Sequence, residues 1–204
     1  MKVKYIVPVI CAAGAIALSS CGVAPHRIDT AGNEGLTTIN QINYKDWQIA
    51  ATKCISSLLA SGVLDRTDGR KTIVMVSTVK NRTFLHIDTN ILTDQIRQAI
   101  LTSGKAVTTT AVGGNGPDDK ATAQVRELSD NPMFNQQTVQ QNGTVIAPDM
   151  SLAGEIIQQN ASLGRKNQSF FFFHMTLTDL KTGLAVWEDN VSIAKQDEKP
   201  LIGF

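Results

Sequence analysis

The side chains that most often carry catalysis or bind metals are few in this chain. Of the three histidines, His86 and His174 have no neighbour at the spacing of a metal site, and His26 lies near the N-terminus. The HExxH, GxSxG and CxxC patterns and the P-loop are absent, and the glycine-rich run at 113–116 lacks the spacing of a phosphate-binding loop. We therefore expect no catalytic residue, no metal site and no cofactor, and expect that the protein is not an enzyme.

The one strong chemical signal lies at the N-terminus and predicts lipid modification. Residues 1–20 have lysines at positions 2 and 4, an uncharged and mostly apolar run over 6–18, and Leu18-Ser19-Ser20 directly before Cys21. The run is shorter than the ~20 apolar residues of a membrane span, and its flanks are typical of a secretory signal. The cysteine makes the segment match the bacterial lipoprotein signal, so we expect cleavage before Cys21 and lipidation of Cys21. An ordinary secretory signal or an unrelated N-terminal helix is the alternative.

This signal predicts a location and a domain organisation. Several acyl chains on Cys21 would anchor the chain firmly, and glycine rather than aspartate at position 22 favours the outer membrane. We expect residues 21–43 to be the lipidated cysteine and a flexible tether. A globular domain over 44–195 then faces the periplasm, and 196–204 form a C-terminal tail.

The predicted cleavage also decides the state of the other two cysteines. Cys11 leaves with the signal, and Cys54 is then the one free thiol. Because Cys54 lies in an apolar helical pattern, we expect it to be buried as a small apolar residue. No intramolecular disulfide is expected.

Asn81-Arg82-Thr83 is the most informative polar group in the body of the chain. It follows a predicted central strand and precedes a predicted helix, which is where open α/β sheets tend to place binding groups. Asparagine and threonine there can equally cap and turn the backbone. The sequence therefore allows two roles for these three residues, contact with a partner and a structural role in the loop.

The elements that position these residues alternate in the first two thirds of the chain. Asp46 is an N-cap candidate for a helix whose apolar residues recur every three or four positions until Gly62 ends it. We expect a central strand over 72–79, a helix over 89–103 and a short strand over 106–111, an order that indicates a parallel crossover. A further helix over 119–129 follows, and then a loop or an irregular helix over 131–143.

The last third predicts an antiparallel meander. Strands are expected over 152–157, 169–180 and 184–193, with a turn over 161–167. In the long strand Phe171 and Phe173 share the face turned to the core, whereas Phe170, Phe172 and His174 lie on the other, and His174 is expected to be partly buried. The fold class is therefore α/β (mixed α+β): a single small domain with a mixed sheet of about four to five strands flanked by helices.

Composition agrees with one folded domain and excludes some partners. The 204 residues are 42% apolar and 18% charged, enough for a core. Removing residues 1–20 takes away two lysines, which changes the formal net charge from +1 to −1. Neither value indicates a nucleic-acid-binding surface.

The order and spacing of several segments resemble a known family. They are Asp46-Trp47, the strand that leads into Val79-Lys80-Asn81-Arg82-Thr83, Leu92 to Leu101 with Ser103-Gly104-Lys105, and Met175 to Gly183 leading into Trp187-Glu188. Over about residues 44–193 the chain resembles the LpoB family of outer-membrane lipoproteins, activators of bifunctional penicillin-binding proteins. The resemblance implies a mixed sheet similar to the TolB N-terminal domain and a protein that does no chemistry itself.

The resemblance also implies a partner and a site. The partner would be a class A penicillin-binding protein, a peptidoglycan synthase, which a monomeric activator would stimulate allosterically. Asn81, Arg82 and Thr83, with Asp88 and Thr89, are the residues we expect to touch it. Two departures from the family are a short, proline-poor tether and the segment 113–147, which does not align with the best-known relatives. A structural or assembly lipoprotein of an envelope or secretion complex, similar to TolB- or CsgG-type domains, is the alternative.

Overall fold

Five strands form one mixed sheet in the order β2-β1-β3-β4-β5. The computed structural model describes residues 27–29, 37–113 and 119–199, so the predicted signal peptide and Cys21 lie outside the described residues. The elements, in chain order, are α1 Tyr44–Ala60, β1 Thr72–Arg82, α2 Asn90–Ser103, β2 Ala106–Thr108, α3 Ala121–Glu127, the 3₁₀ turn η1 Leu128–Asp130, β3 Met150–Leu163, β4 Lys166–Asp179 and β5 Ala185–Glu198.

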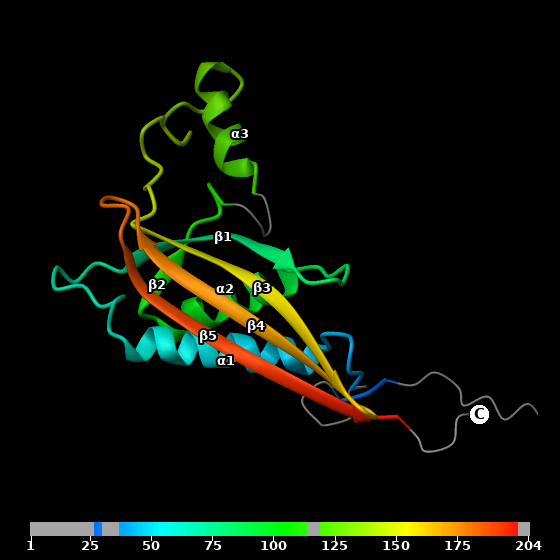
Figure 1. Cartoon of the computed structure of the whole chain (residues 1–204). Coiled ribbons are helices and arrows are strands. Elements are labelled where there is room, and N and C mark those ends of the chain that lie inside the picture. Colours follow the sequence, from blue (N-terminus) through cyan, green and yellow to red (C-terminus); the bar gives the residue numbers. More distant parts are fainter. Residues whose placement is uncertain (1–26, 30–36, 114–118, 200–204) are drawn as a thin grey trace, which may run out of the picture.

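The strand directions confirm the predicted fold class, crossover and meander. β1 runs parallel to both β2 and β3, whereas β3, β4 and β5 are antiparallel neighbours. Helices α1 and α2 pack together on one face of the sheet, α3 stands away from it, and β3–β5 sweep past the helices as one long ribbon (Figure 1).

Several predicted boundaries are wrong: β1 continues to Arg82 instead of ending at 79, β2 ends at Thr108 instead of 111, and β5 continues to Glu198 instead of ending at 193. The N-cap of α1 is Asn43, and Asp46 is the N3 residue of a capping box: Asn43 Oδ1 accepts from Asp46 N at 3.0 Å, and Asp46 Oδ2 accepts from Asn43 N at 2.7 Å. The predicted turn over 161–167 is mostly strand, because β3 and β4 stay paired down to Leu163 and Lys166. Polar cross-strand contacts replace apolar alternation there, such as Asn167 Nδ2 donating to Asp197 Oδ1 at 3.1 Å.

A β-bulge in β1 decides which of its side chains reach each face. Val76 pairs with Leu152 and Val79 with Gly154, so Ser77 and Thr78 together oppose one residue of β3. Val74, Val76 and Val79 are therefore all buried in the core, and Lys80 and Arg82 turn to the other face. Gly154 lies opposite the bulge, where a Cβ would come within 2.4 Å of Met175 Sδ and 2.5 Å of the His174 carbonyl oxygen.

The core lies between this sheet and the two packed helices. Leu92, Ile96 and Ile100 of α2 are buried, and Gly104 in the left-handed conformation ends that helix. Phe171 and Phe173 of β4 face the core as predicted, and Phe173 meets Trp47 of α1 edge to face with ring centroids 5.7 Å apart.

A buried ion pair fastens α1 to the edge strand β5. Lys195 Nζ lies 2.5 Å from Asp46 Oδ2, and the two side chains are 6% and 8% exposed. Lys195 Nζ also donates to the Gln41 carbonyl at 2.6 Å and lies 5.9 Å from the centre of the Phe171 ring. The cation thus replaces lost hydration with a carboxylate, a carbonyl and an aromatic face.

Substituting Lys195→Met should lower the free energy of unfolding by about 3–5 kcal/mol, because it leaves the Asp46 carboxylate buried without its cation. The double variant with Asp46→Asn should recover part of that loss, since asparagine still accepts from Asn43 N. Urea unfolding followed by circular dichroism measures both. In the exposed Arg70–Asp68 pair, Arg70→Ala is the control and should cost less than about 1 kcal/mol. A loss that small in Lys195→Met would contradict the structural role of the ion pair.

Cys54 is buried in α1, as predicted. Burial, helped by the negative charge of Asp189, raises the pKa of its thiol to about 12. The thiol is therefore uncharged at neutral pH and lacks the thiolate that reacts with alkylating reagents.

Iodoacetamide at about pH 8 should leave Cys54 unmodified in the folded chain and modify it fully in concentrated urea, as read by mass spectrometry of the peptide that carries it. The folded state favours the protonated thiol. Its stability contribution is therefore complete below the ordinary pKa of 9.0, and the free energy of unfolding should decline as pH rises from there towards 12. Rapid labelling of the folded chain would contradict the burial of the thiol.

Candidate partner-binding surface

The sheet face opposite α1 and α2 combines charged and aromatic side chains, and we call it the open face. Its residues around the end of β1 are Lys80, Arg82, Glu155, Ile157, Phe170, Phe172, His174 and Glu188. They come from four neighbouring strands. The registers place Lys80, Glu155 and His174 in one cross-strand row and Arg82, Ile157 and Phe172 in the next. Glu188 lies on β5, opposite Thr176 of β4.

Four of these side chains form a continuous line of polar contacts across the sheet. Arg82 Nη1 lies 3.2 Å from Glu155 Oε2, and His174 Nδ1 lies 4.0 Å from Glu155 Oε1. His174 Nε2 lies 2.8 Å from Glu188 Oε1. His174 is 31% exposed at its side chain, which agrees with the partly buried strand residue predicted from the sequence. The two ring nitrogens of His174 thus face carboxylates on either side, with Nε2 within hydrogen-bond distance of Glu188 and Nδ1 farther from Glu155.

Aromatic and aliphatic side chains border this line. Phe170 and Phe172 stack at 6.5 Å between ring centroids, and Ile157 is the cross-strand neighbour of Phe172. All three side chains remain partly exposed. A surface that offers arginine and aromatic rings together has the composition of protein–protein binding hot spots.

Arg82 owes its position on this face to the β1 bulge. Without the extra residue, strand alternation would turn position 82 towards the helices, on the same side as Val76. With it, Arg82 stands beside Glu155 and 64% of its side chain stays exposed. The guanidinium is thus oriented by one carboxylate and still accessible to a partner.

Asn81 and Thr83 build the turn that follows. Asn81 Oδ1 accepts from Thr83 N at 2.9 Å and Thr83 Oγ1 at 2.7 Å, and Asn81 Nδ2 donates to the Leu85 carbonyl at 2.7 Å. Thr83 Oγ1 accepts from Leu85 N at 3.0 Å. These contacts show that both side chains shape the loop, whereas their contact with a partner stays a prediction.

Asp88 and Thr89 serve the start of α2. Asp88 Oδ1 accepts from Asn90 N at 2.9 Å, and the Thr89 carbonyl accepts from Thr93 N at 3.3 Å. Thr89 is buried. The structure does not place them in the line of Arg82, Glu155, His174 and Glu188.

Phe84 is an exposed residue that the sequence reasoning missed. It follows Asn81-Arg82-Thr83 directly and is 85% exposed. Its backbone N–H donates to Oε1 of the buried Gln158 at 3.3 Å, which pins the loop to β3 while the ring stays in solvent. An aromatic residue directly after Asn81-Arg82-Thr83, in the loop before a helix, was the signal that could have identified it.

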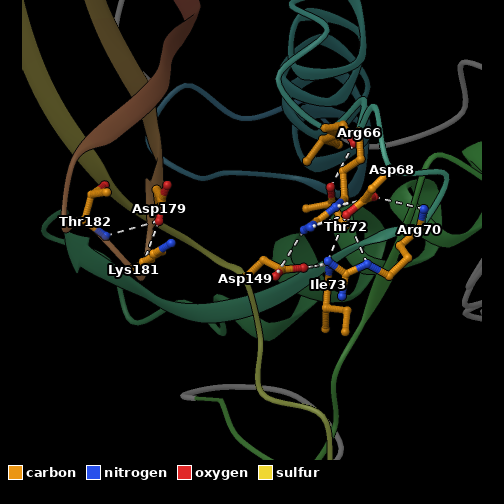
Figure 2. A network of polar contacts seen from close by, with 10 residues as sticks. Arg66, Asp68, Arg70, Thr72, Ile73, Asp149, Asp179, Lys181 and Thr182 are labelled. Carbon is orange, nitrogen blue, oxygen red and sulfur yellow. Dashed lines mark hydrogen bonds and ion pairs between the residues drawn. The ribbon is translucent and has the colours of Figure 1, made fainter.

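A second polar cluster, at the opposite end of β1, is structural (Figure 2). Asp149 Oδ2 accepts from Ile73 N at 3.0 Å, and Asp149 Oδ1 lies 3.2 Å from Arg66 Nη1. Asp68 accepts from Arg66 and Arg70, whose guanidinium groups hold the pKa of that carboxyl well below its usual range. These acids hold the chain ahead of β1 and β3.

In the turn between β4 and β5, another aspartate carboxylate accepts hydrogen bonds from backbone N–H groups. Asp179 Oδ1 accepts from Lys181 N at 2.7 Å and Thr182 N at 3.2 Å, and Figure 2 shows these contacts as a separate group.

In residues 27–29, 37–113 and 119–199, no three His, Cys, Asp or Glu side chains are arranged to hold a metal ion. The same residues contain no helix with the length and apolar content of a membrane span.

Comparison with known proteins gives one family match. The model of the family described as peptidoglycan-synthase activator LpoB matches residues 46–193. No curated protein sequence matches the chain.

Solved structures show distant similarity. The LpoB C-terminal domain from Escherichia coli is 16% identical, with 72% of this chain and 98% of that chain covered and a TM-score of 0.43. The corresponding domain from Salmonella enterica gives the same values. Lipoprotein GNA1162 from Neisseria meningitidis is 13% identical, with 61% and 83% covered and a TM-score of 0.35.

Asn81→Ala should destabilise the domain by about 1–2 kcal/mol, because it removes three hydrogen bonds that shape the loop. Faster amide exchange at Thr83 and Leu85 than at the centre of β1 would locate the effect. Asn142→Ala, at an exposed asparagine in another loop, is the matched control and should stay within about 0.5 kcal/mol. Equal effects of the two variants would contradict the structural role of Asn81.

Proposed function

The chain belongs to the LpoB family of peptidoglycan-synthase activators, and from this premise we propose that it binds a class A penicillin-binding protein and raises its rate of glycan polymerisation. The observation that carries the proposal is the family match over residues 46–193, which extends from α1 into β5. The protein itself would be non-catalytic, acting on the bifunctional synthase by binding alone.

The contact surface we propose is the open face together with the loop that carries Phe84. Arg82 is the one member of the predicted set Asn81, Arg82, Thr83, Asp88 and Thr89 whose charged group lies on that face. Its neighbours Phe84 and Phe172 supply apolar area, and a partner that covers them would remove arginine and aromatic rings from water together. Asn81 and Thr83 would contribute by holding the loop in place.

Stimulation would be allosteric. A binding partner shifts an enzyme towards its active conformation only if it binds that conformation more tightly than the inactive one. A tenfold shift in the equilibrium requires about 1.4 kcal/mol of differential affinity. Contacts of Arg82 and Phe84 that form only with the active conformation of the synthase would supply a differential affinity of this size.

We also propose that the chain is a monomer held to the outer membrane through lipidated Cys21, with the domain in the periplasm. The N-terminal signal pattern supports this. Ser169 Oγ donates to Asn40 Oδ1 at 3.1 Å and Lys195 Nζ to the Gln41 carbonyl, so the chain enters the domain at a fixed place on β4 and β5. Residues 22–39 can reach at most about 60 Å from the anchor to that place.

Arg82→Ala and Phe84→Ala should each weaken binding to the class A synthase of the same organism by about tenfold or more, the loss of a hot-spot residue. Both should lower the stimulated polymerisation rate when the activator is below saturation. Their melting temperatures should stay near that of the unchanged chain, because the Arg82–Glu155 pair is exposed and Phe84 packs little. Surface plasmon resonance and a lipid II polymerisation assay provide the two readouts.

Arg70→Ala is the matched control. Arg70 is a comparably exposed arginine at the other end of the same strand and also pairs with one carboxylate, so its substitution should leave binding unchanged. If the unchanged chain neither bound nor stimulated any class A synthase of its organism, the proposal would fail. Capture of outer-membrane or secretion components by a photo-reactive residue at position 82 would instead support an assembly lipoprotein.

A further inference from the structure

A groove of about 410 Å³ runs between α1 and α2, on the side of the sheet away from the open face. Its polar walls consist of side-chain amides and hydroxyls from Gln48, Thr52, Gln95, Gln98 and Thr102. In the part of the chain that the structure describes, no charged side chain lines it. The groove therefore offers several neutral donors and acceptors over a short distance.

Two alanines lie at the floor of the groove, and Tyr44 lies outside the lining but contacts it through Gln48. Ala51 and Ala99 keep the floor shallow and apolar. Tyr44 stands one turn before Gln48 on α1, its hydroxyl accepts from Gln48 Nε2 at 3.2 Å, and the residue is 47% exposed. An accessible aromatic ring is thus tied to a groove-lining amide.

One acceptor in this groove lacks a partner. Gln95 Oε1 is shielded from solvent and accepts no hydrogen bond, although Gln95 lines the groove. A buried amide oxygen without a donor costs about 1–3 kcal/mol. A ligand reaches this oxygen once the Gln95 side chain turns outward into the groove, and an N–H or O–H donated there would relieve that cost.

We propose that this groove binds a neutral sugar chain that carries acetamido groups, the chemistry of the glycan strand that peptidoglycan synthases make. Sugar hydroxyls and acetamido groups are both donors and acceptors and match the amides and hydroxyls of the walls. The apolar face of a sugar ring fits the ring of Tyr44. The uncharged lining disfavours the carboxylate-bearing peptide stems, which need a cation for recognition.

The choice of glycan rests on the proposed function, whereas the neutral polar site itself does not. Because α1 and α2 cover the sheet face opposite the open face, a synthase on one side leaves the groove free on the other. The protein would then hold the enzyme and its polymeric product at the same time, which raises the local concentration of one near the other.

The test is a titration of the full chain, purified in mild detergent, with neutral N-acetylglucosamine oligomers and no synthase present. Backbone amide shifts in the NMR spectrum should move saturably at Gln48, Gln95 and their helix neighbours. Glucose oligomers of the same linkage lack the acetamido group and should bind at least about tenfold more weakly. Muropeptide stems without sugar should cause no shift at the groove.

Thr52→Trp fills the groove from an exposed position and should weaken N-acetylglucosamine binding by at least about tenfold. Lys53→Trp, the next exposed residue of α1 and not part of the lining, is the matched control and should bind as the unchanged chain does. Both should melt normally, and Thr52→Trp should still bind the synthase, which separates this proposal from the previous one. Absence of shifts at the groove, full binding by Thr52→Trp, or equal binding of glucose oligomers would overturn it.

Discussion

The buried contact between Lys195 and Asp46 holds together the parts on which the rest of the structure depends. Lys195 belongs to the last strand and Asp46 to the first turn of the first helix, and the pair spans most of the chain. Two charges can be buried together only if further polar groups replace their water. The Gln41 carbonyl and the Asn43 N–H do so here. The pair thereby holds α1 over β4 and β5, on the face of the sheet that carries Phe171 and Phe173.

The other face becomes a surface because of one inserted residue in β1. The bulge at Ser77 and Thr78 keeps Val79 in the core and sends Arg82 to the uncovered side. Gly154 accommodates the close approach of Met175 and the His174 carbonyl beside it. A local departure from strand geometry therefore connects core packing to the placement of the exposed guanidinium.

Much of this fold follows from the sequence because its signals are local. The alternation of Phe171 and Phe173 with Phe170 and Phe172 predicted both faces of β4, and Gly62 marked the end of α1. The line of contacts through Glu155, His174 and Glu188 was not predictable in this way, since it depends on the pairing of three strands. The three-residue step from Val76 to Val79 was a sign of the bulge. The N-cap of α1 was predicted three residues too late, because Asn43 lies before the start of the apolar pattern that predicted the helix.

The two binding surfaces proposed for this protein, the open face and the α1–α2 groove, lie on opposite sides of the sheet. If a glycan in the α1–α2 groove tightened the hold on a synthase at Arg82 and Phe84, thermodynamic linkage would require the bound synthase to tighten the hold on the glycan equally. The sheet and the Lys195–Asp46 pair connect both sites through packed, hydrogen-bonded groups. Coupling between them would then appear as equal factors in the two affinities, whereas a passive scaffold would leave each affinity unchanged by the other ligand.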